Sequence, residues 1–111
     1  MRRIRPYLLA PLVAVLVAAL AVSALAATTS VTVRKSGSGF RFAPASLSIR
    51  KGDTVRWAWR GSVAHNVKGP GFQSKTAPTL AYSRRFTRAG TYRVVCTIHQ
   101  ALGQKMTITV R

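Results

Sequence analysis

Alternation of apolar and polar residues is the feature that most constrains what this chain can fold into. The alternation recurs in short runs from Val31 to Val110. Side chains two residues apart lie on the same face of a strand, so each run predicts a strand with one buried face. The apolar positions of these runs are Val31 and Val33, Leu47 and Ile49, Val55, Trp57 and Trp59, Tyr92 and Val94, and Met106, Ile108 and Val110.

Turn-forming residues separate these runs. The turn signals are Ser36-Gly37-Ser38-Gly39, Ala43-Pro44, Lys51-Gly52-Asp53, Lys68-Gly69-Pro70-Gly71, Ala77-Pro78 and Arg88-Ala89-Gly90. Beyond residue 27, no stretch has the apolar spacing of an amphipathic helix. Many short strands joined by frequent turns are typical of an antiparallel β-sandwich, and we therefore expect an all-β fold.

The beginning of the chain has the pattern of an export signal. Arginines at positions 2, 3 and 5 precede an uncharged stretch from Leu8 to Ala27, and Ala24-Leu25-Ala26 fits the small-x-small pattern of a cleavage site. The prediction is a signal peptide at residues 1–26 followed by one domain at residues 27–111. The apolar stretch is also long enough to cross a bilayer, so an uncleaved membrane anchor is the alternative.

Charge limits both the chemistry and the partners of this chain. It has 18 Lys and Arg residues and one acidic residue, Asp53, for a formal net charge of +17. A single carboxylate, placed in a turn signal, excludes paired acid/base groups and a carboxylate cage for calcium or magnesium. The basic surface would attract acidic proteins, anionic polymers and lipid headgroups. Export argues against a specific nucleic-acid site.

Cys96 needs an explanation, because a single cysteine in an exported protein forms no internal disulfide. It follows the predicted strand through Val94, and His99 stands three residues further on, before the last strand begins. His65 follows another strand, the one that contains Trp59, after a short turn. The only cysteine and both histidines therefore fall in loops at strand ends, where a sandwich can bring them together.

A thiolate and two imidazoles suit copper in both oxidation states, with a weak axial donor completing the site. Zinc is the nearest alternative metal, but closed structural zinc sites use four strong ligands and this set offers three. A Cys-His nucleophilic pair would lack a carboxylate to orient the histidine. We therefore predict one copper ion bound by His65, Cys96 and His99.

From about Val31 to Val110 the sequence resembles the plastocyanin, amicyanin and pseudoazurin group of cupredoxins, the blue copper proteins. The resemblance implies a Greek-key β-sandwich of seven or eight strands, with one copper ion that exchanges single electrons and no catalytic activity. The matching segments are Phe42-Ala43-Pro44 before Leu47-Ser48-Ile49, Gly52-Asp53-Thr54-Val55, His65-Asn66-Val67, Phe86-Thr87-Arg88-Ala89-Gly90-Thr91-Tyr92 and Cys96-Thr97-Ile98-His99.

By position, the resemblance makes His65, Cys96 and His99 the equatorial copper ligands. It also gives a supporting role to Asn66, which follows the first histidine. In that role Asn66 would tie the two ligand loops together and donate its backbone N–H to the cysteine sulfur. The alternative is a loop asparagine that makes local hydrogen bonds.

The axial position departs from the commoner family pattern. Members with this loop spacing carry methionine where this chain has Gln104. The resemblance is therefore to the glutamine-ligated, stellacyanin-like variant, in which an amide oxygen favours Cu(II) and lowers the reduction potential. Met106 is the alternative axial ligand, and a core methionine is its other role. A site without an axial protein ligand is the third alternative.

The expected function is one-electron transfer outside the cytoplasm by a monomer. Electrons would pass through the exposed edge of His99, which is framed by Ala101, Leu102 and Pro70, and a basic rim would recruit an acidic redox partner. The alternative that uses the same ligands is copper storage, delivery or tolerance in the cell envelope. A metal-free module that binds envelope polymers through its charge is a third reading.

Overall fold

The alternating runs form strands whose apolar side chains point into one core. In β4 (Thr54–Trp59), Val55 and Trp57 are fully buried and Trp59 nearly so, whereas Arg56 between them is exposed. Each valine or tryptophan thus turns inward and each neighbour outward, as the period of a strand requires. The same alternation buries one face of the final strand. In both strands, the apolar positions of the sequence pattern are the buried positions.

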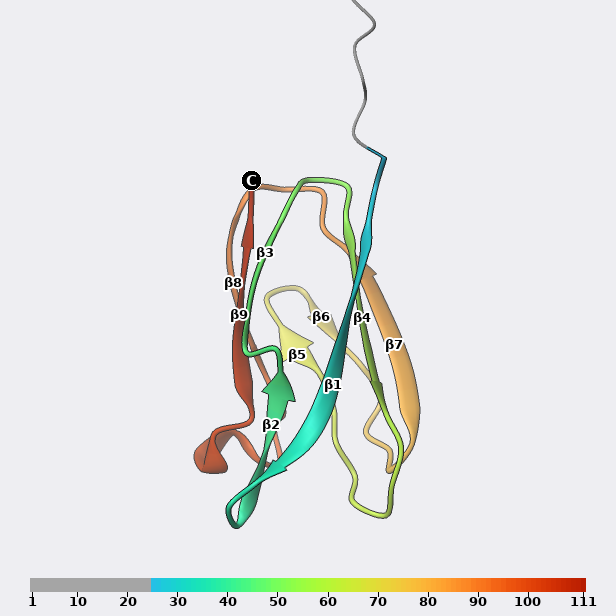
Figure 1. The fold of residues 1–111 in the computed structure, drawn as a ribbon, viewed down its shortest axis with the longest axis vertical. Helices are drawn as coiled ribbons and strands as arrows, with labels where there is room; N and C mark the ends of the chain where they lie inside the picture. Colours follow the sequence, from blue (N-terminus) through green and yellow to red (C-terminus); the bar gives the residue numbers. More distant parts are fainter. Residues whose placement is uncertain (1–24) are drawn as a thin grey trace, which may run out of the picture.

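The computed structural model describes residues 25–111, which form an all-β sandwich (Figure 1). This confirms the expected fold. The strands are β1 (Thr28–Ser36), β2 (Gly39–Ala43), β3 (Ser46–Ile49), β4 (Thr54–Trp59), β5 (Lys68–Gly69), β6 (Phe72–Gln73), β7 (Leu80–Arg85), β8 (Gly90–Val95) and β9 (Lys105–Val110). A short 3-10 helix, η1 (Gln100–Leu102), precedes β9. Because β5 and β6 have two residues each, the other seven strands correspond to the seven or eight expected.

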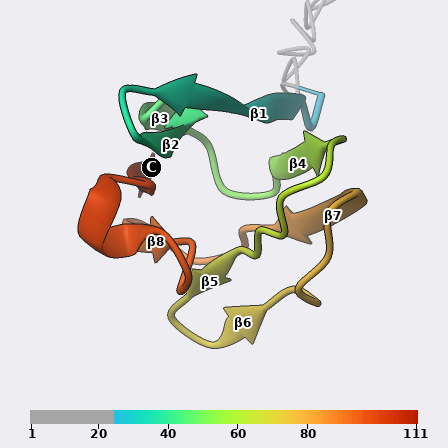
Figure 2. The same cartoon turned by 90° about the horizontal axis from the view of Figure 1, so that it is seen from below.

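Two sheets face each other across the core (Figure 2). One has the order β2-β1-β4-β7 and the other β3-β9-β8-β5-β6. Most neighbours are antiparallel, but β1 pairs with β4 and β3 with β9 in parallel. The alternating pattern predicted an antiparallel sandwich and did not reveal these two pairs. They arise because the chain crosses to the second sheet between β2 and β3 and returns to the first between β3 and β4, so that strands distant in sequence become neighbours.

Trp57 occupies the centre of the core. Its side chain is fully buried, and its ring lies 6.2 Å from that of Phe72 and 5.9 Å from that of Tyr82, centroid to centroid. Its indole Nε1–H donates to the Met106 sulfur at 3.2 Å. The buried apolar set is Val31, Phe42, Ile49, Val55, Trp57, Trp59, Val67, Phe72, Phe86, Val94, Cys96, Met106, Ile108 and Val110.

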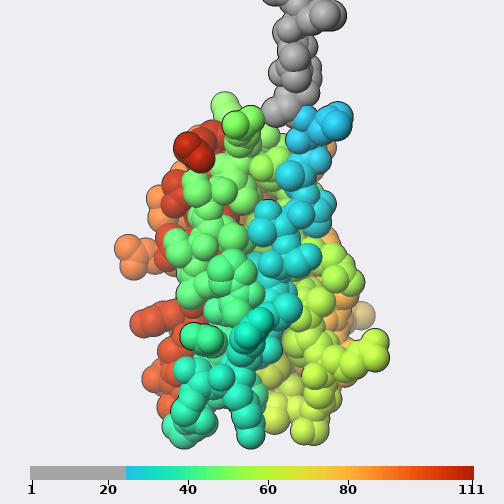
Figure 3. Space-filling view, in the orientation of Figure 1, coloured from blue at the N-terminus to red at the C-terminus, as the bar shows by residue number. Residues whose placement is uncertain are grey.

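The two ends of the sandwich carry different features. β1 starts at the end where β9 finishes, and η1 and the β1–β2 turn lie at the other end (Figure 1). In the space-filling view, β1 lies between β2 and β4 along the visible face (Figure 3). Of the predicted signal peptide, residues 1–24 lie outside the described residues. Within residues 25–111, no helix has the length and apolar character needed to cross a membrane.

Candidate metal centre

The loop between β8 and β9 folds back on itself through backbone hydrogen bonds. Cys96 N–H donates to Gln104 O at 2.9 Å, which closes the loop at its base. His99 N–H donates to Cys96 O at 3.2 Å, and this turn brings the histidine back beside the cysteine. Gln104 N–H in turn donates to His99 O at 3.2 Å. The spacing Cys-x-x-His thus becomes a turn with both side chains on one side.

Glycine is required at two places around this loop. Gly103 ends η1 with φ of 95°, in the left-handed region that other residues rarely adopt. Gly39 in the β1–β2 hairpin packs so closely on the loop that an added Cβ would lie 2.7 Å from Leu102 Cβ. These two glycines allow the hairpin and the ligand loop to pack directly together.

His65 is fixed by the segment between β6 and β7. Its backbone N–H donates to Ala77 O and its carbonyl accepts from Ala77 N–H, each at 3.1 Å. Trp59 Nε1–H also donates to Ala77 O, at 2.8 Å. The imidazole of His65 is only 4% exposed. These backbone hydrogen bonds therefore position the His65 ring without the help of a metal ion.

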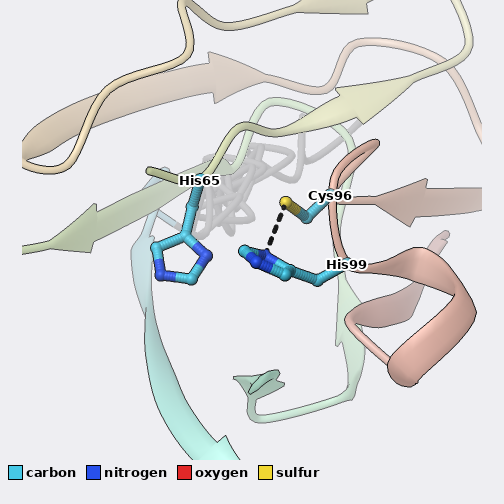
Figure 4. Close-up of side chains that lie close together, drawn as sticks. All are labelled: His65, Cys96 and His99. Atoms are coloured by element: carbon cyan, nitrogen blue, oxygen red, sulfur yellow. Dashed lines mark hydrogen bonds between the residues drawn. The ribbon is translucent and has the colours of Figure 1, made fainter. Parts of the chain in front are cut away.

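The three side chains predicted to bind copper converge on one point (Figure 4). One ligand atom each from His65, Cys96 and His99 can be chosen so that all lie within 4.8 Å of one another. Cys96 Sγ lies 3.6 Å from His99 Nδ1. Ligands that bind one metal ion at about 2.0–2.3 Å are spaced roughly 3–4 Å apart. The donor set and its spacing therefore fit one copper ion.

Gln104 completes this cluster. Its Oε1 lies 3.1 Å from His65 Nδ1 and 3.0 Å from His99 Nδ1, so the amide oxygen and both ring nitrogens face the same point. The side chain is fully buried, yet its Nε2 has no hydrogen-bond partner among the described residues. Buried amides normally satisfy both ends. The Gln104 amide is thus oriented so that its oxygen, and not its nitrogen, faces the two histidines.

Met106, the alternative axial ligand, faces the core. It is 4% exposed and its sulfur accepts the hydrogen bond from Trp57. Met106 is the second residue of β9 and follows Gln104 by two positions, so its side chain lies further along the inner face of the sheet. Met106 therefore has the burial and the hydrogen bond of a core methionine, the other role considered for it.

Asn66 bridges the two ligand loops through its side chain. Its Oδ1 accepts from Thr97 N–H at 2.8 Å, and its Nδ2 donates to Thr97 Oγ1 at 2.7 Å and to Thr76 Oγ1 at 2.9 Å. Thr97 is the residue after Cys96, so this amide links the His65 loop to the cysteine loop. The predicted donation from Asn66 backbone N–H to the sulfur stays a prediction.

Phe40 is a site residue that sequence reasoning missed. Its ring centroid lies 4.7 Å from that of His65 and 4.9 Å from that of His99, so one aromatic side chain packs on both imidazoles. The alternation of Phe40 with the buried Phe42 was a signal for a strand here. Contact with the histidines depends on how the hairpin packs, which the alternation does not give.

Burial controls the protonation of His65. Removal from water lowers the pKa of this ring below its ordinary value of 6.5, and the nearby His99 lowers it further. The hydrogen bond with Gln104 opposes this shift. A lowered pKa keeps the imidazole neutral at neutral pH, which is the form that binds a metal.

The loop also forms the outer surface over the cluster. His99 is half-buried, Ala101 is exposed, and Leu102 is 54% exposed. Ile98, which the sequence analysis did not single out, is 50% exposed. The loop that carries His99 therefore exposes apolar side chains on both sides of this histidine in the sequence.

A β-sandwich with one thiol and two imidazoles gathered at one end defines a cupredoxin. Over residues 27–111 the sequence matches the family described as copper binding proteins, plastocyanin/azurin family. The chain therefore belongs to the plastocyanin/azurin family of copper-binding proteins.

Individual relatives agree with this assignment. The chain is 34% identical over 84 residues to plastocyanin from Scenedesmus fuscus, an alignment that covers 63% of this chain and 86% of the plastocyanin. It is 35% identical over 74 residues to amicyanin from Paracoccus denitrificans, covering 56% of this chain and 53% of the amicyanin. It therefore spans about half the length of that protein.

Among solved structures, the chain is similar to a methionine-to-glutamine mutant of amicyanin in the Cu(I) state. The TM-score is 0.59 at 30% identity, and the match covers 76% of this chain and 82% of the mutant chain. The two chains thus share the fold over most of their lengths.

Proposed function

We propose that the protein is a type 1 copper protein that carries one electron at a time outside the cytoplasm, and that it is not an enzyme. The observation that carries this proposal is the convergence of His65, Cys96, His99 and the oxygen of Gln104 at one end of the sandwich. When bound there, copper supplies an ion that exchanges one electron between Cu(I) and Cu(II).

The contribution of the protein is to hold the four donors in place. Backbone hydrogen bonds fix His65 to Ala77 and close the loop from Cys96 to Gln104. The Asn66 side chain then locks the two loops to each other. Donors held this firmly rearrange little when the charge at the site changes, and small rearrangement favours fast electron exchange.

Gln104 is the proposed axial ligand. Its Oε1 already faces both ring nitrogens, whereas the Met106 sulfur is engaged by Trp57. An amide oxygen is a harder donor than a thioether and stabilises Cu(II). The reduction potential should therefore be low for this class of protein.

The proposed redox partner is a protein with an acidic docking surface. The net charge of +17, which falls to +14 if Arg2, Arg3 and Arg5 leave with a cleaved leader, would steer such a partner toward the protein. Lys35 and Arg60 line a hollow of about 310 Å³ beside His65, which gives the site end a basic rim. Electron exit through His99 would use the apolar surface around it, where Ala101 and Leu102 lie. We expect the protein to act as a monomer.

The proposed location is outside the cytoplasm, because residues 1–26 have the pattern of a signal peptide. The described chain begins at the end of the sandwich opposite the ligand cluster (Figure 1). Either a cleaved leader or a membrane anchor would therefore leave the cluster free to meet a partner.

Two rates measured on the copper-loaded protein test electron transfer against copper delivery. At high ionic strength, which screens the repulsion between two copies of this basic protein, we expect fast electron self-exchange, seen as NMR line broadening in mixtures of the two oxidation states, and slow loss of copper to a chelator. Leu102→Lys should slow self-exchange more than Thr109→Lys, which adds the same charge at the end away from the cluster. Slow self-exchange combined with ready copper loss would favour storage or delivery instead.

A further inference from the structure

Asp53, the only acidic residue of the chain, lies where the fold begins. Its Oδ1 accepts from Ala27 N–H and its Oδ2 from Arg50 N–H, both at 3.0 Å. Ala27 O accepts in turn from Thr54 N–H at 2.9 Å. Ala27 is therefore held through both of its backbone groups, directly before β1.

The chain immediately before Ala27 is not held in this way. Leu25 is 93% exposed and Ala26 is also exposed, and neither hydrogen-bonds to residues 27–111. The small-x-small pattern of Ala24-Leu25-Ala26 places a cleavage site directly after Ala26. The predicted cleavage point thus coincides with the boundary between exposed chain and fixed chain.

We propose that removal of the leader leaves the α-ammonium group of Ala27 ion-paired with Asp53. A leader peptidase would use one water molecule to hydrolyse the Ala26–Ala27 amide bond. Ala26 departs with a carboxylate, and the amino group released on Ala27 takes up a proton. The sole side-chain carboxylate of the protein is then the counter-ion of its mature N-terminus.

The chemistry of the two groups supports this pairing. Before cleavage Asp53 accepts one neutral N–H from Ala27, and after cleavage it faces an ammonium group with three donors. Hydrogen bonds between ionised partners are shorter and stronger than neutral ones. The backbone N–H groups of Ala27 and Arg50 lower the pKa of Asp53, so the carboxylate is charged at neutral pH.

Other cations lie near this pair, and the test must allow for them. Arg50 acts on Asp53 through its charge, and Arg85 Nε donates to Gly52 O at 3.2 Å. Both would lower the pKa of a neighbouring amine. A raised pKa of the Ala27 amine would therefore report the carboxylate itself.

The first experiment identifies the N-terminus. The full-length chain is expressed with its own leader in an exporting host, and the intact mass of the purified product is measured. We expect the mass of residues 27–111. A mass that corresponds to any other N-terminus, or to the uncleaved chain, would overturn the proposal.

The second experiment measures the α-amino pKa of that exported product by NMR. We expect it to lie about half a unit higher in the wild type than in Asp53→Asn, in line with the strength of an exposed ion pair. Asn keeps an oxygen that can accept from Ala27 N–H. Ser38→Lys, which changes the net charge equally but lies in the hairpin at the other end, should leave the pKa nearly unchanged.

A further measurement needs no variant. Acetylation of the wild-type α-amino group removes its charge and keeps one N–H donor, so it should raise the pKa of Asp53. An α-amino pKa equal in the wild type and Asp53→Asn, or an Asp53 pKa that ignores acetylation, would overturn the ion pair. Copper binding is irrelevant to these readouts, so they can fail or succeed independently of the proposed electron transfer.

Discussion

Gln104 and Met106 are two residues apart and both buried, yet they belong to different regions of the molecule. Gln104 faces the ligand cluster, where its oxygen touches the ring nitrogens of His65 and His99. Met106 faces the core, where its sulfur accepts from Trp57. One region gathers polar atoms around a point, and the other packs apolar groups against each other.

The two regions differ in how completely their buried polar atoms are hydrogen-bonded. The indole N–H of Trp57 has its acceptor, whereas Gln104 Nε2 has no partner among the described residues. A buried donor without a partner costs about 1–3 kcal/mol. The contact between Trp57 and Met106 therefore stabilises the core. The orientation of Gln104 that turns its oxygen toward the two histidines instead carries an energetic cost.

Met106→Ala has the largest expected effect, and it tests whether Met106 acts as a core residue. Truncation of a buried methionine should lower the free energy of unfolding by about 2–5 kcal/mol. The copper spectrum should stay that of the wild type, because the Met106 sulfur is hydrogen-bonded by Trp57, whereas the oxygen of Gln104 faces the two histidines. Chemical denaturation measures the first, and visible absorption the second. A changed spectrum would make Met106 the axial ligand.

Asn66→Ala tests how far the contacts beside the ligand cluster support copper binding. Loss of the amide removes the link between Asn66 and Thr97, which orients the cysteine loop. Removing such a supporting contact should lower copper affinity about 10- to 100-fold. Competition with a chelator of known affinity measures this loss. Thr76→Val is the matched control, because it removes only the link to Thr76 and should cost less.

Gln104→Met separates stability from metal chemistry. The change removes the unpartnered Nε2, a gain of about 1–3 kcal/mol, and loses two oxygen contacts, a cost of about 0.5–1.5 kcal/mol for each. These two changes nearly cancel, so the free energy of unfolding of the copper-free protein, measured by denaturation, should change by less than about 1 kcal/mol. The softer sulfur should also raise the reduction potential. An unchanged potential would contradict axial binding by Gln104.

The smallest effect concerns pH. Because the pKa of His65 is lowered in the folded state, the unfolded chain takes up a proton that the folded chain resists. The copper-free protein should therefore lose stability as the pH falls below 6.5, the ordinary value for this ring, and should keep full stability above it. Denaturation at several pH values measures this slope. A His65→Asn variant with the same slope as the wild type would contradict the assignment.

Much of this architecture could be predicted from the sequence. The alternation through Val55, Trp57 and Trp59 defines a strand with one buried face, and the burial follows it. The spacing of Cys96 and His99 predicts a shared loop, since a turn of three residues returns the chain on itself.

Other features depend on contacts that local patterns do not encode. Alternation shows which face of β1 is buried, but it does not show that β4 is its parallel neighbour. Phe40 reaches both imidazoles only because the hairpin packs on the ligand loop, where Gly39 approaches Leu102. The Gln104 amide nitrogen, which has no partner within residues 25–111, likewise becomes visible only in three dimensions.

Copper binding by the sulfur of Cys96, together with the two histidines, can be tested by a spectroscopic comparison. Cu(II) is added to the purified protein and to Cys96→Ser, and the visible absorption of both is recorded. We predict an intense thiolate-to-copper charge-transfer band in the wild type and none in the variant, with both proteins folded. Absence of the band from folded wild-type protein with reduced Cys96 would mean that the Cys96 sulfur does not bind copper.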